Sequence, residues 1–166
     1  MNATAQAAGS EGQARCSCTA LRKASRRVSQ LYDAALSRSG LSINQRGILA
    51  HIGRSVPLTV GQLAEALVMD PGALAHTLKP LERDGLTTAS VDPNDRRRRL
   101  ITLTPAGRAK LAETDGLWAE AQRSFEAAFS QVESETLRAA LQVLVTGKFT
   151  DAFHSALATG THKTGD

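Results

Sequence analysis

Apolar residues near the start of the chain recur at alternating intervals of three and four positions. They are Leu21, Ala24, Val28, Leu31 and Ala35. An α-helix completes one turn in about 3.6 residues, so this spacing places these side chains on one face. The pattern predicts a long amphipathic helix over about 19–38 that ends at Gly40, a residue suited to the left-handed conformation after a helix.

Two capping boxes follow, each made of a hydroxyl residue and a glutamine three positions later. The pairs are Ser42 with Gln45 and Thr59 with Gln62. In such a box each side chain binds the backbone amide of the other residue, which satisfies amides left free at the start of a helix. The first pair predicts a short helix that stops at Gly53, and the second predicts a short helix from Val60 to about Leu67.

A further short helix is predicted after these two. Asp70 can cap it, and Pro71 suits its first position because a missing amide costs nothing there. Gly85 is placed to end the helix in the left-handed conformation. Pro80 removes the amide that would bind the carbonyl of His76, which predicts a bend or a loosened turn. Two short helices joined by a tight turn are typical of a helix-turn-helix.

A short β-hairpin is predicted next, with strands over 86–91 and 100–103 and a turn at Pro93 and Asn94. Apolar and polar residues alternate in the second strand, so one face should pack on the preceding helices. The four consecutive arginines at 96–99 then fall at the exposed tip. Adjacent cations repel one another, and a nucleic acid backbone would neutralise them. The alternative is a solvated basic turn that binds nothing.

The last part of the chain is predicted to be helical. Thr104 and Pro105 open a long helix, and Ser130 with Glu133 predicts a restart as one final helix. Apolar residues of the long helix recur every seventh position at Leu111, Trp118, Phe125 and Val132. One side of the final helix carries Leu137, Leu141, Leu144, Val145, Phe149 and Phe153. A seven-residue spacing is typical of helices packed side by side, which favours a second copy of the chain; packing within one chain is the alternative.

The distribution of charge along the chain is more informative than the total charge. The 166 residues carry a formal net charge of +4, and basic residues concentrate at 15–27 and 96–99. The length suits one folding unit. The chain lacks a run of about 20 apolar residues that could span a bilayer, and 1–12 lack the features of a secretory signal. We therefore expect a cytoplasmic protein without a membrane partner, with a disordered arm at 1–14 and a disordered tail at 159–166.

Cys16 and Cys18 are the two cysteines of the sequence, too few for a disulfide framework. At this spacing they do not pair easily with each other, so a redox role would use a bridge between subunits. Arg15 and Arg22 would lower the pKa of a nearby thiol. Inert packing is the alternative. The histidines are scattered and no Cys/His pair has zinc-site spacing, so we expect no metal and no cofactor.

Three motifs occupy the centre of the chain. They are Leu-Glu-Arg-Asp-Gly-Leu at 81–86, Asp-Pro-Asn-Asp-Arg-Arg at 92–97 and Leu-Thr-Pro-Ala-Gly at 103–107. Together they resemble the signature of the MarR family of winged helix-turn-helix regulators, over about 20–154. The resemblance implies a mainly α fold with a small β-wing, assembled as a triangular homodimer. It divides one domain, 15–158, into a winged DNA-binding lobe at 41–103 and dimerisation helices at 15–40 and 104–158.

The resemblance also implies a mode of DNA binding, with the fourth helix in the major groove and the wing in an adjacent minor groove. Asp95 and Arg97 match the family's wing pair, in which the carboxylate braces the guanidinium. A narrow minor groove concentrates negative potential and favours such an arginine. Arg96, Arg98 and Arg99 are then phosphate contacts, which supply affinity without sequence preference.

The fourth predicted helix departs from the family's pattern. Relatives often carry Ser or Thr early and Arg later, whereas this chain has mostly small residues there, followed by His76. The candidates for base contacts are Ala73, His76, Thr77 and Lys79. With so few hydrogen-bonding groups, we expect sequence choice to rely on DNA shape. The alternative for His76 is an exposed helix residue without a partner.

Family members commonly respond to a small aromatic or phenolic anion held between the dimer helices and the winged lobe. The residues on elements expected to border such a cleft are Arg27, Tyr32, Arg46, His51 and Trp118. An arginine beside aromatic rings suits a carboxylate with an apolar body. A structural or surface role is the alternative for each of them.

These features favour a ligand-responsive transcriptional regulator. It would be a repressor that binds a pseudo-palindromic operator in double-stranded DNA as a homodimer and is released by a small-molecule effector. A thiol-based redox regulator using the two cysteines and a winged-helix protein-interaction module are the alternatives. The sequence shows no glycine-rich phosphate loop, no nucleophile beside a base and no recognisable carboxylate pair, so we expect no enzymatic activity.

Overall fold

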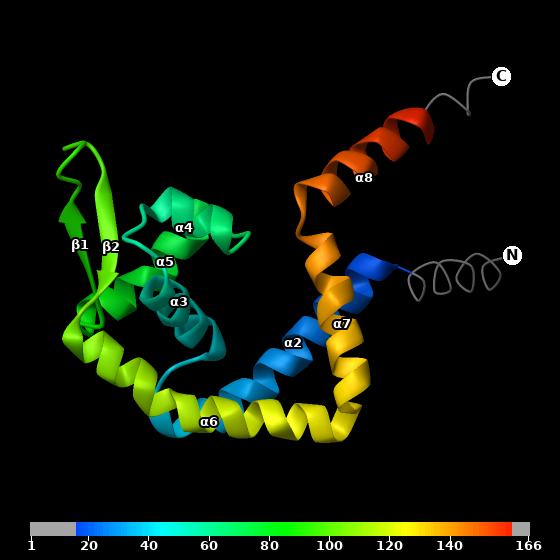
Figure 1. Ribbon diagram of the computed structural model, residues 1–166, viewed down its shortest axis with the longest axis horizontal. Helices are drawn as coiled ribbons and strands as arrows, with labels where there is room; N and C mark the ends of the chain where they lie inside the picture. The colour runs from blue at the N-terminus through cyan, green and yellow to red at the C-terminus, as the bar shows by residue number, and fades with distance from the viewer. Residues whose placement is uncertain (1–15, 161–166) are drawn as a thin grey trace, which may run out of the picture. The chain divides into compact units, whose positions relative to one another are not determined.

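The computed structural model describes residues 16–160, and the chain divides in sequence into two compact units between Ala121 and Gln122. We call residues up to 121 the winged unit and residues from 122 the C-terminal unit. Figure 1 shows the elements of both. The fold is mainly α-helical with one two-stranded antiparallel sheet, as predicted.

The winged unit begins with a long helix, α2 (Ser17–Leu36), followed by a 3-10 turn, η1 (Ser37–Ser39). Gly40 follows with φ 72°, which is the left-handed conformation predicted for it. Leu36 is the one described residue of α2 that is fully buried. The predicted helix is therefore confirmed, but most of its length does not take part in the core of this unit.

The capping boxes start the next two helices as predicted. In α3 (Ile43–Arg54) and α4 (Val60–Ala66) both hydrogen bonds of each box are present. The prediction that Gly53 ends α3 is wrong, because the helix continues through it to Arg54. A Cβ at Gly53 would lie 3.0 Å from the Leu103 side chain. This glycine lets the helix pack closely on the sheet.

Helix α5 (Pro71–Arg83) begins at its predicted cap, where Asp70 accepts a hydrogen bond from the Ala73 amide at 2.9 Å. It continues through Pro80 without ending there. Gly85 has φ 68°, and the Leu86 amide donates to the Leu81 carbonyl at 2.8 Å. This is the bond of a Schellman C-cap, which turns the chain sharply into the sheet.

The sheet pairs β1 (Thr87–Val91) with β2 (Arg99–Leu103), in a register that places Thr87 opposite Leu103 and Val91 opposite Arg99. The Ile101 amide also donates to the Leu58 carbonyl at 2.8 Å, which fixes β2 to the loop before α4. One core unites α3, α4, α5 and β2. Its buried residues are Leu41, Ile48, Leu49, Ile52, Leu63, Ala64, Leu74, Leu78, Leu81, Ile101 and Leu103.

A close backbone contact joins the turn between α5 and β1 to the start of α6 (Pro105–Phe129), the helix that runs across the unit boundary. The Thr104 hydroxyl donates to the Gly85 carbonyl at 2.6 Å and accepts from the Gly107 amide at 2.9 Å. A Cβ at Gly107 would lie 1.9 Å from the carbonyl oxygen of Leu86. Only glycine permits this approach, so the start of α6 is fixed to the end of α5.

The C-terminal unit contains α7 (Gln131–Leu144) and α8 (Gly147–Gly160). The prediction of one final helix is therefore wrong. The chain breaks at Val145 and Thr146, and the Thr146 hydroxyl accepts from the Phe149 amide at 3.2 Å to start α8. Helix α8 extends past 158, into the segment predicted to be a disordered tail; residues 161–166 of that tail and the predicted arm at 1–14 lie outside the described residues.

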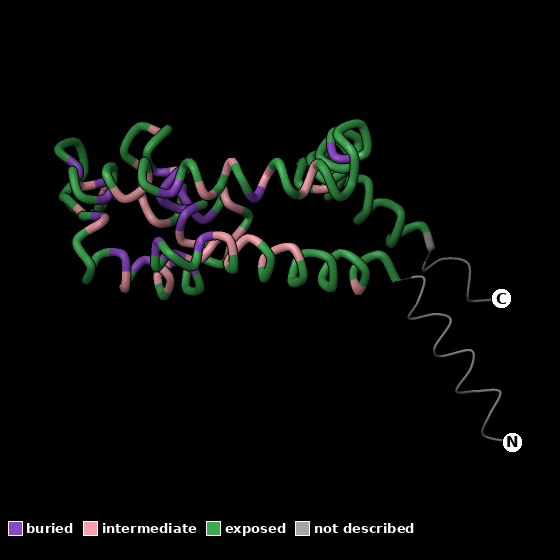
Figure 2. The backbone as a smooth tube through the Cα atoms, turned by 90° about the horizontal axis from the view of Figure 1, so that it is seen from below, coloured by how far each residue is buried: buried purple, intermediate pink, exposed green. Residues whose placement is uncertain are grey.

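Apolar side chains remain exposed in the C-terminal unit. Figure 2 shows α8 exposed along its described length, and its exposed apolar residues include Phe149, Phe153 and Leu157. On α7 the exposed apolar residues are Val132, Leu137, Leu141 and Val143. None of the described helices is both long enough and apolar enough to cross a membrane.

Candidate nucleic-acid interface

The tip of the hairpin is built from two successive tight turns. The Asp95 amide donates to the Asp92 carbonyl at 3.2 Å, and the Arg98 amide donates to the Asp95 carbonyl at 2.9 Å. Asp92 is buried, and its carboxylate accepts a hydrogen bond from the backbone amide of Asn94 at 2.8 Å. The predicted turn at Pro93 and Asn94 is confirmed. The tip is therefore an ordered projection, because its own backbone holds it.

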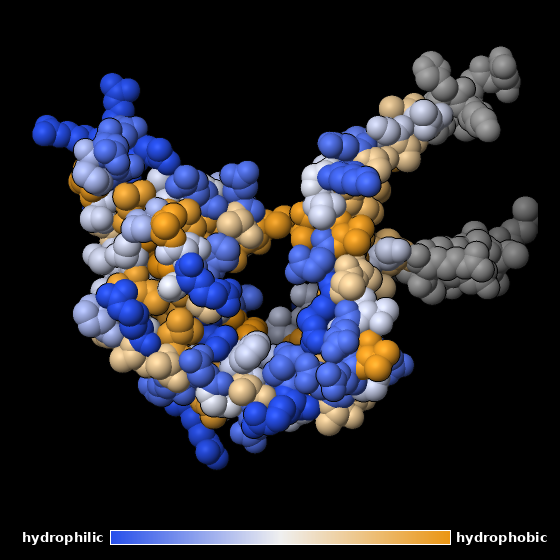
Figure 3. Space-filling view, viewed as in Figure 1, coloured by the Kyte–Doolittle hydropathy of each residue, from blue (hydrophilic) through white to orange (hydrophobic). Residues whose placement is uncertain are grey.

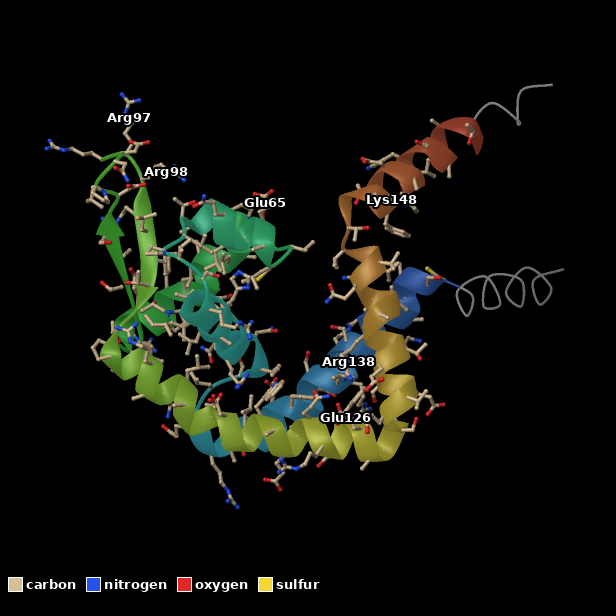
Figure 4. The ribbon with its side chains drawn as sticks, in the orientation of Figure 1. Glu65, Arg97, Arg98, Glu126, Arg138 and Lys148 are labelled. Atoms are coloured by element: carbon tan, nitrogen blue, oxygen red, sulfur yellow. The ribbon has the colours of Figure 1, made fainter. Side chains whose placement is uncertain are left out.

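Three arginines extend from this tip. Arg96, Arg97 and Arg98 are exposed, and no ion pair joins them to a carboxylate within 16–160. Figure 4 shows Arg97 pointing away from the strands, and Figure 3 shows hydrophilic side chains gathered at this end of the winged unit. Unpaired guanidinium groups on a projecting loop produce a concentrated positive potential.

Two details of the wing differ from the prediction. Arg99 is not at the tip: it lies on β2, and its guanidinium donates to the Ala89 carbonyl at 3.0 Å. Asp95 does not brace the guanidinium of Arg97; its carboxylate accepts from the Arg97 backbone amide at 3.0 Å. Asp95 thus shapes the turn, and the Arg97 side chain is left unrestrained by it.

Helix α5 presents its polar residues on the side opposite the core. Leu74, Leu78 and Leu81 are buried, whereas His76 and Lys79 are exposed. Ala73 is also exposed. The half-buried Thr77 donates its hydroxyl to the Ala73 carbonyl at 3.0 Å, so this donor is already occupied within the helix. The helix offers few free hydrogen-bonding groups, in line with the sequence.

An open groove of about 720 Å³ lies between the outer face of α5 and the first turn of α3. Its lining residues are Ser42, Asn44, Gln45, His76, Thr77, Lys79, Pro80 and Arg83. The Arg83 guanidinium donates to Asp84 at 2.9 Å, and this contact raises the pKa of Arg83. Asn44 and Arg83 were not among the contacts predicted from the sequence. Arg83 follows His76 by two helical turns, a spacing that does indicate the same face.

A second pocket, of about 370 Å³, lies within the winged unit between α3, β2 and α6. Arg46 is one of three arginines that line it. The Arg46 guanidinium donates to the Thr114 hydroxyl at 3.1 Å and to the Asp115 carboxylate at 2.7 Å, and it lies 4.8 Å from the centre of the Trp118 ring. The Arg46 side chain is 10% exposed and that of Asp115 is 65% exposed. The other lining residues are Ala50, Gly53, Arg54, Leu103, Arg108, Leu111 and Ala112.

The structure brings together two of the five residues predicted to border a ligand cleft. Arg46 and Trp118 line the same pocket, but His51, on α3, is not among its lining residues. Arg27 and Tyr32 lie on α2, where Arg27 borders a shallow surface depression with other polar residues. The pocket thus combines three arginines, one carboxylate, one indole ring and apolar walls.

Cys16 and Cys18 are both exposed free thiols at the start of α2. The hydroxyl and amide of Thr19 lower the pKa of the Cys16 thiol, although these contacts fall short of a capping hydrogen bond. In residues 16–160 no three His, Cys, Asp or Glu side chains lie together as a metal site would require.

Comparison with known proteins gives consistent matches. A sequence model described as the MarR family matches residues 39–98. A crystal structure of a probable transcriptional regulator from Pseudomonas aeruginosa is 34% identical, with a TM-score of 0.70, over 78% of this chain and 97% of that one. A transcriptional regulator of M. tuberculosis, MosR, solved in complex with DNA, is 32% identical, with a TM-score of 0.73, over 83% of this chain and 98% of that one.

A curated relative adds a similar match over a shorter span. The putative transcriptional regulatory protein for the hcr operon of Thauera aromatica is 30% identical over 98 residues, which are 59% of each chain. The chain thus spans about three fifths of that relative's length.

Proposed function

The chain belongs to the MarR family, and from this premise we propose that it is a transcriptional regulator that binds double-stranded DNA as a homodimer. The observation that carries the proposal is the unpaired guanidinium cluster at the ordered wing tip, in the same unit as a helix-turn-helix whose second helix has an exposed polar face. The similarity to a regulator solved with DNA supports the same partner.

In this proposal α5 enters the major groove and the wing follows an adjacent groove. Arg96, Arg97 and Arg98 would neutralise phosphates and release condensed counterions, so binding should weaken steeply as salt rises. Among them Arg97 is our candidate for the minor groove, where a planar permanent cation gains most from a narrow A·T-rich segment. Few base contacts are available on α5, so DNA shape would carry much of the specificity.

The exposed apolar residues support the homodimer. Phe149, Phe153 and Leu157 lie on α8 and are 39%, 54% and 55% exposed. Contiguous apolar surface of this kind is typical of a protein interface. A dimer would bind a pseudo-palindromic operator whose half-sites are about one helical turn apart.

The pocket beside Arg46 is our candidate effector site. We propose that it takes a small monoanion with an aromatic or apolar body, whose carboxylate replaces Asp115 as the partner of Arg46. Asp115 is mostly exposed, so its release costs little, while Trp118 and the apolar wall would cover the body of the ligand. Ligand binding would favour an arrangement of α3 and α6 in which the protein binds DNA more weakly. Repression would then be relieved.

DNA binding is tested by gel shift with the region upstream of the protein's own gene, at several salt concentrations. We expect a specific complex that weakens as salt rises. Arg97→Ala should weaken it at least tenfold, and Arg97→Lys should recover only part, because lysine lacks the planar fork. A wild-type protein without any shift on this region or on competitor DNA would rule out the proposal.

The effector site is tested by adding benzoate, as a probe aromatic acid, to the preformed complex. We expect release from DNA in the wild type and a weaker response in Arg46→Met. Asp115→Asn removes the competing carboxylate and should make release occur at lower benzoate concentration. Equal sensitivity of all three proteins would place the response elsewhere.

A thiol trigger is the second candidate, favoured by the lowered pKa of the exposed Cys16. A lower pKa increases the thiolate fraction near neutral pH and so the rate of alkylation or oxidation. We expect iodoacetamide to label Cys16 faster than Cys18 at pH 7, and Thr19→Val to reduce the difference, because valine lacks the hydroxyl but keeps the backbone amide. Peroxide that leaves DNA affinity unchanged in the wild type would exclude this trigger.

A further inference from the structure

The groove between α3 and α5 contains three predicted base contacts, His76, Thr77 and Lys79, but the sequence predicted no DNA contact from its α3 side or from Arg83. Its polar and basic lining comes from two helices that are close in space but distant in sequence. Lys79 and Arg83 provide two cations on α5, and none of the groove's lining residues is acidic. A groove with this lining favours an anionic occupant.

We propose that this groove seats one strand of the DNA phosphate backbone, with Asn44 and Arg83 as contacts. The inference rests on the proposed function, because it requires α5 to face DNA. His76 and Arg83 lie on the same face of α5, so a duplex that meets His76 also meets Arg83. Asn44 is exposed, and no hydrogen bond occupies its side-chain amide within 16–160, so it has free donors for a phosphate oxygen.

The ion pair of Arg83 with Asp84 fits this role. Both side chains are exposed, at 76% and 53%, and an exposed pair of this kind contributes little to stability. Asp84 therefore positions the guanidinium without holding it firmly. A phosphate can take the place of the carboxylate at small cost, and the arginine keeps its charge throughout.

Substitutions at Asn44 separate DNA binding from folding. Asn44 is the second residue of α3, where the helix dipole favours a negative charge and disfavours a positive one. Asn44→Asp should therefore preserve or increase helix stability and repel phosphate. Asn44→Lys should decrease helix stability and attract phosphate. In each variant helix stability and DNA affinity should change in opposite directions, so unfolding would not explain a loss of affinity.

The test is fluorescence anisotropy of the full-length variants with a labelled mixed-sequence duplex of about 30 base pairs, long enough for two half-sites. We expect Asn44→Asp and Arg83→Ala each to weaken binding roughly tenfold, and Arg83→Ala to lower the slope of log affinity against log salt by about one per subunit. Asn44→Lys should strengthen binding several-fold and raise the slope by about one per subunit. Asp84→Asn should also strengthen it, because a competing carboxylate is removed.

Two controls make the outcome decisive. Lys148→Ala removes an exposed cation from α8 and should leave affinity and slope unchanged, and Arg97→Ala should weaken binding through the wing. If Arg97→Ala weakens binding while the Asn44, Arg83 and Asp84 variants all match the wild type, the groove proposal is wrong and DNA binding stands. If the wild type does not bind any duplex, the proposed function itself is wrong. Thermal melting by circular dichroism verifies that each variant is folded.

Discussion

The winged unit and the C-terminal unit differ in how they bury apolar surface. In the winged unit, leucines such as Leu49, Leu63 and Leu74 are fully buried by three helices and the sheet. In the C-terminal unit the buried residue of α7 is Ser134, and residues 147–159 of α8 are all exposed. Local capping and a closed core are therefore sufficient to bury the apolar surface of the winged unit, whereas the C-terminal unit has exposed apolar faces suited to a partner chain.

The largest effect should follow from breaking the contact that fixes α6 to the wing. Gly107→Ala would force a Cβ into the Leu86 carbonyl, so either α6 or the backbone at Leu86 must move. We expect a loss of about 3 kcal/mol or more in the free energy of unfolding, measured by urea denaturation. Gly116→Ala is the matched control on the same helix, with open space around its Cβ, and should gain about 0.5–1 kcal/mol. Equal effects of both would show that the close approach is absent.

The second prediction concerns the C-terminal unit. Phe149→Asp combined with Phe153→Asp places two charges on the exposed apolar face of α8. We expect the dimer to dissociate at least a hundredfold more readily, about 2.7 kcal/mol, in sedimentation equilibrium. The winged unit should keep its helix content, because its core does not include these residues. An unchanged mass in solution would contradict the proposed interface.

The third prediction is a smaller difference in stability, between substitutions at the two partners of the ion pair that joins α3 to α6. Arg46→Met removes a nearly buried guanidinium with two hydrogen bonds, and we expect a loss of about 2 kcal/mol. Asp115→Asn changes a mostly exposed group and should cost less than about 1 kcal/mol. Thermal and urea denaturation at matched pH measure both. A greater loss for Asp115→Asn would reverse our view of which partner is structural.

The smallest effect should be a gain within the winged unit. The Thr87 hydroxyl is buried and has no hydrogen-bond partner among residues 16–160. Thr87→Val keeps the shape of the side chain and removes the unsatisfied group, so we expect a gain of about 1 kcal/mol. Thr88→Val, at an exposed neighbouring position, is the control and should change stability little. A loss on Thr87→Val would show that the hydroxyl has a partner.

Local signals were sufficient to predict most of the fold. The caps at Ser42, Thr59 and Asp70 are each completed by a residue three positions later, so the sequence alone contains both partners. The break between α7 and α8 was missed because its signal, a threonine cap before Gly147, is short and interrupts a continuous apolar stripe.

The parts of the site that the sequence did not reveal depend on contacts between distant residues. Arg46 was predicted to meet a ligand, but its partners Thr114 and Asp115 lie on another helix and have no local signal. The wing pair was predicted from a family motif, and here Asp95 binds a backbone amide instead. Gly53 shows the same limit, since its role is set by the Leu103 side chain.

The most direct test of the account is the salt dependence of DNA affinity for the wild type and for a variant with Arg96, Arg97 and Arg98 all changed to alanine. Anisotropy titrations of one labelled duplex from low to physiological salt give the slope of log affinity against log salt. We predict that the variant binds much more weakly and that its slope is smaller by roughly three per wing. A folded variant with the wild-type affinity and slope would contradict the claim that this wing tip attaches the protein to DNA.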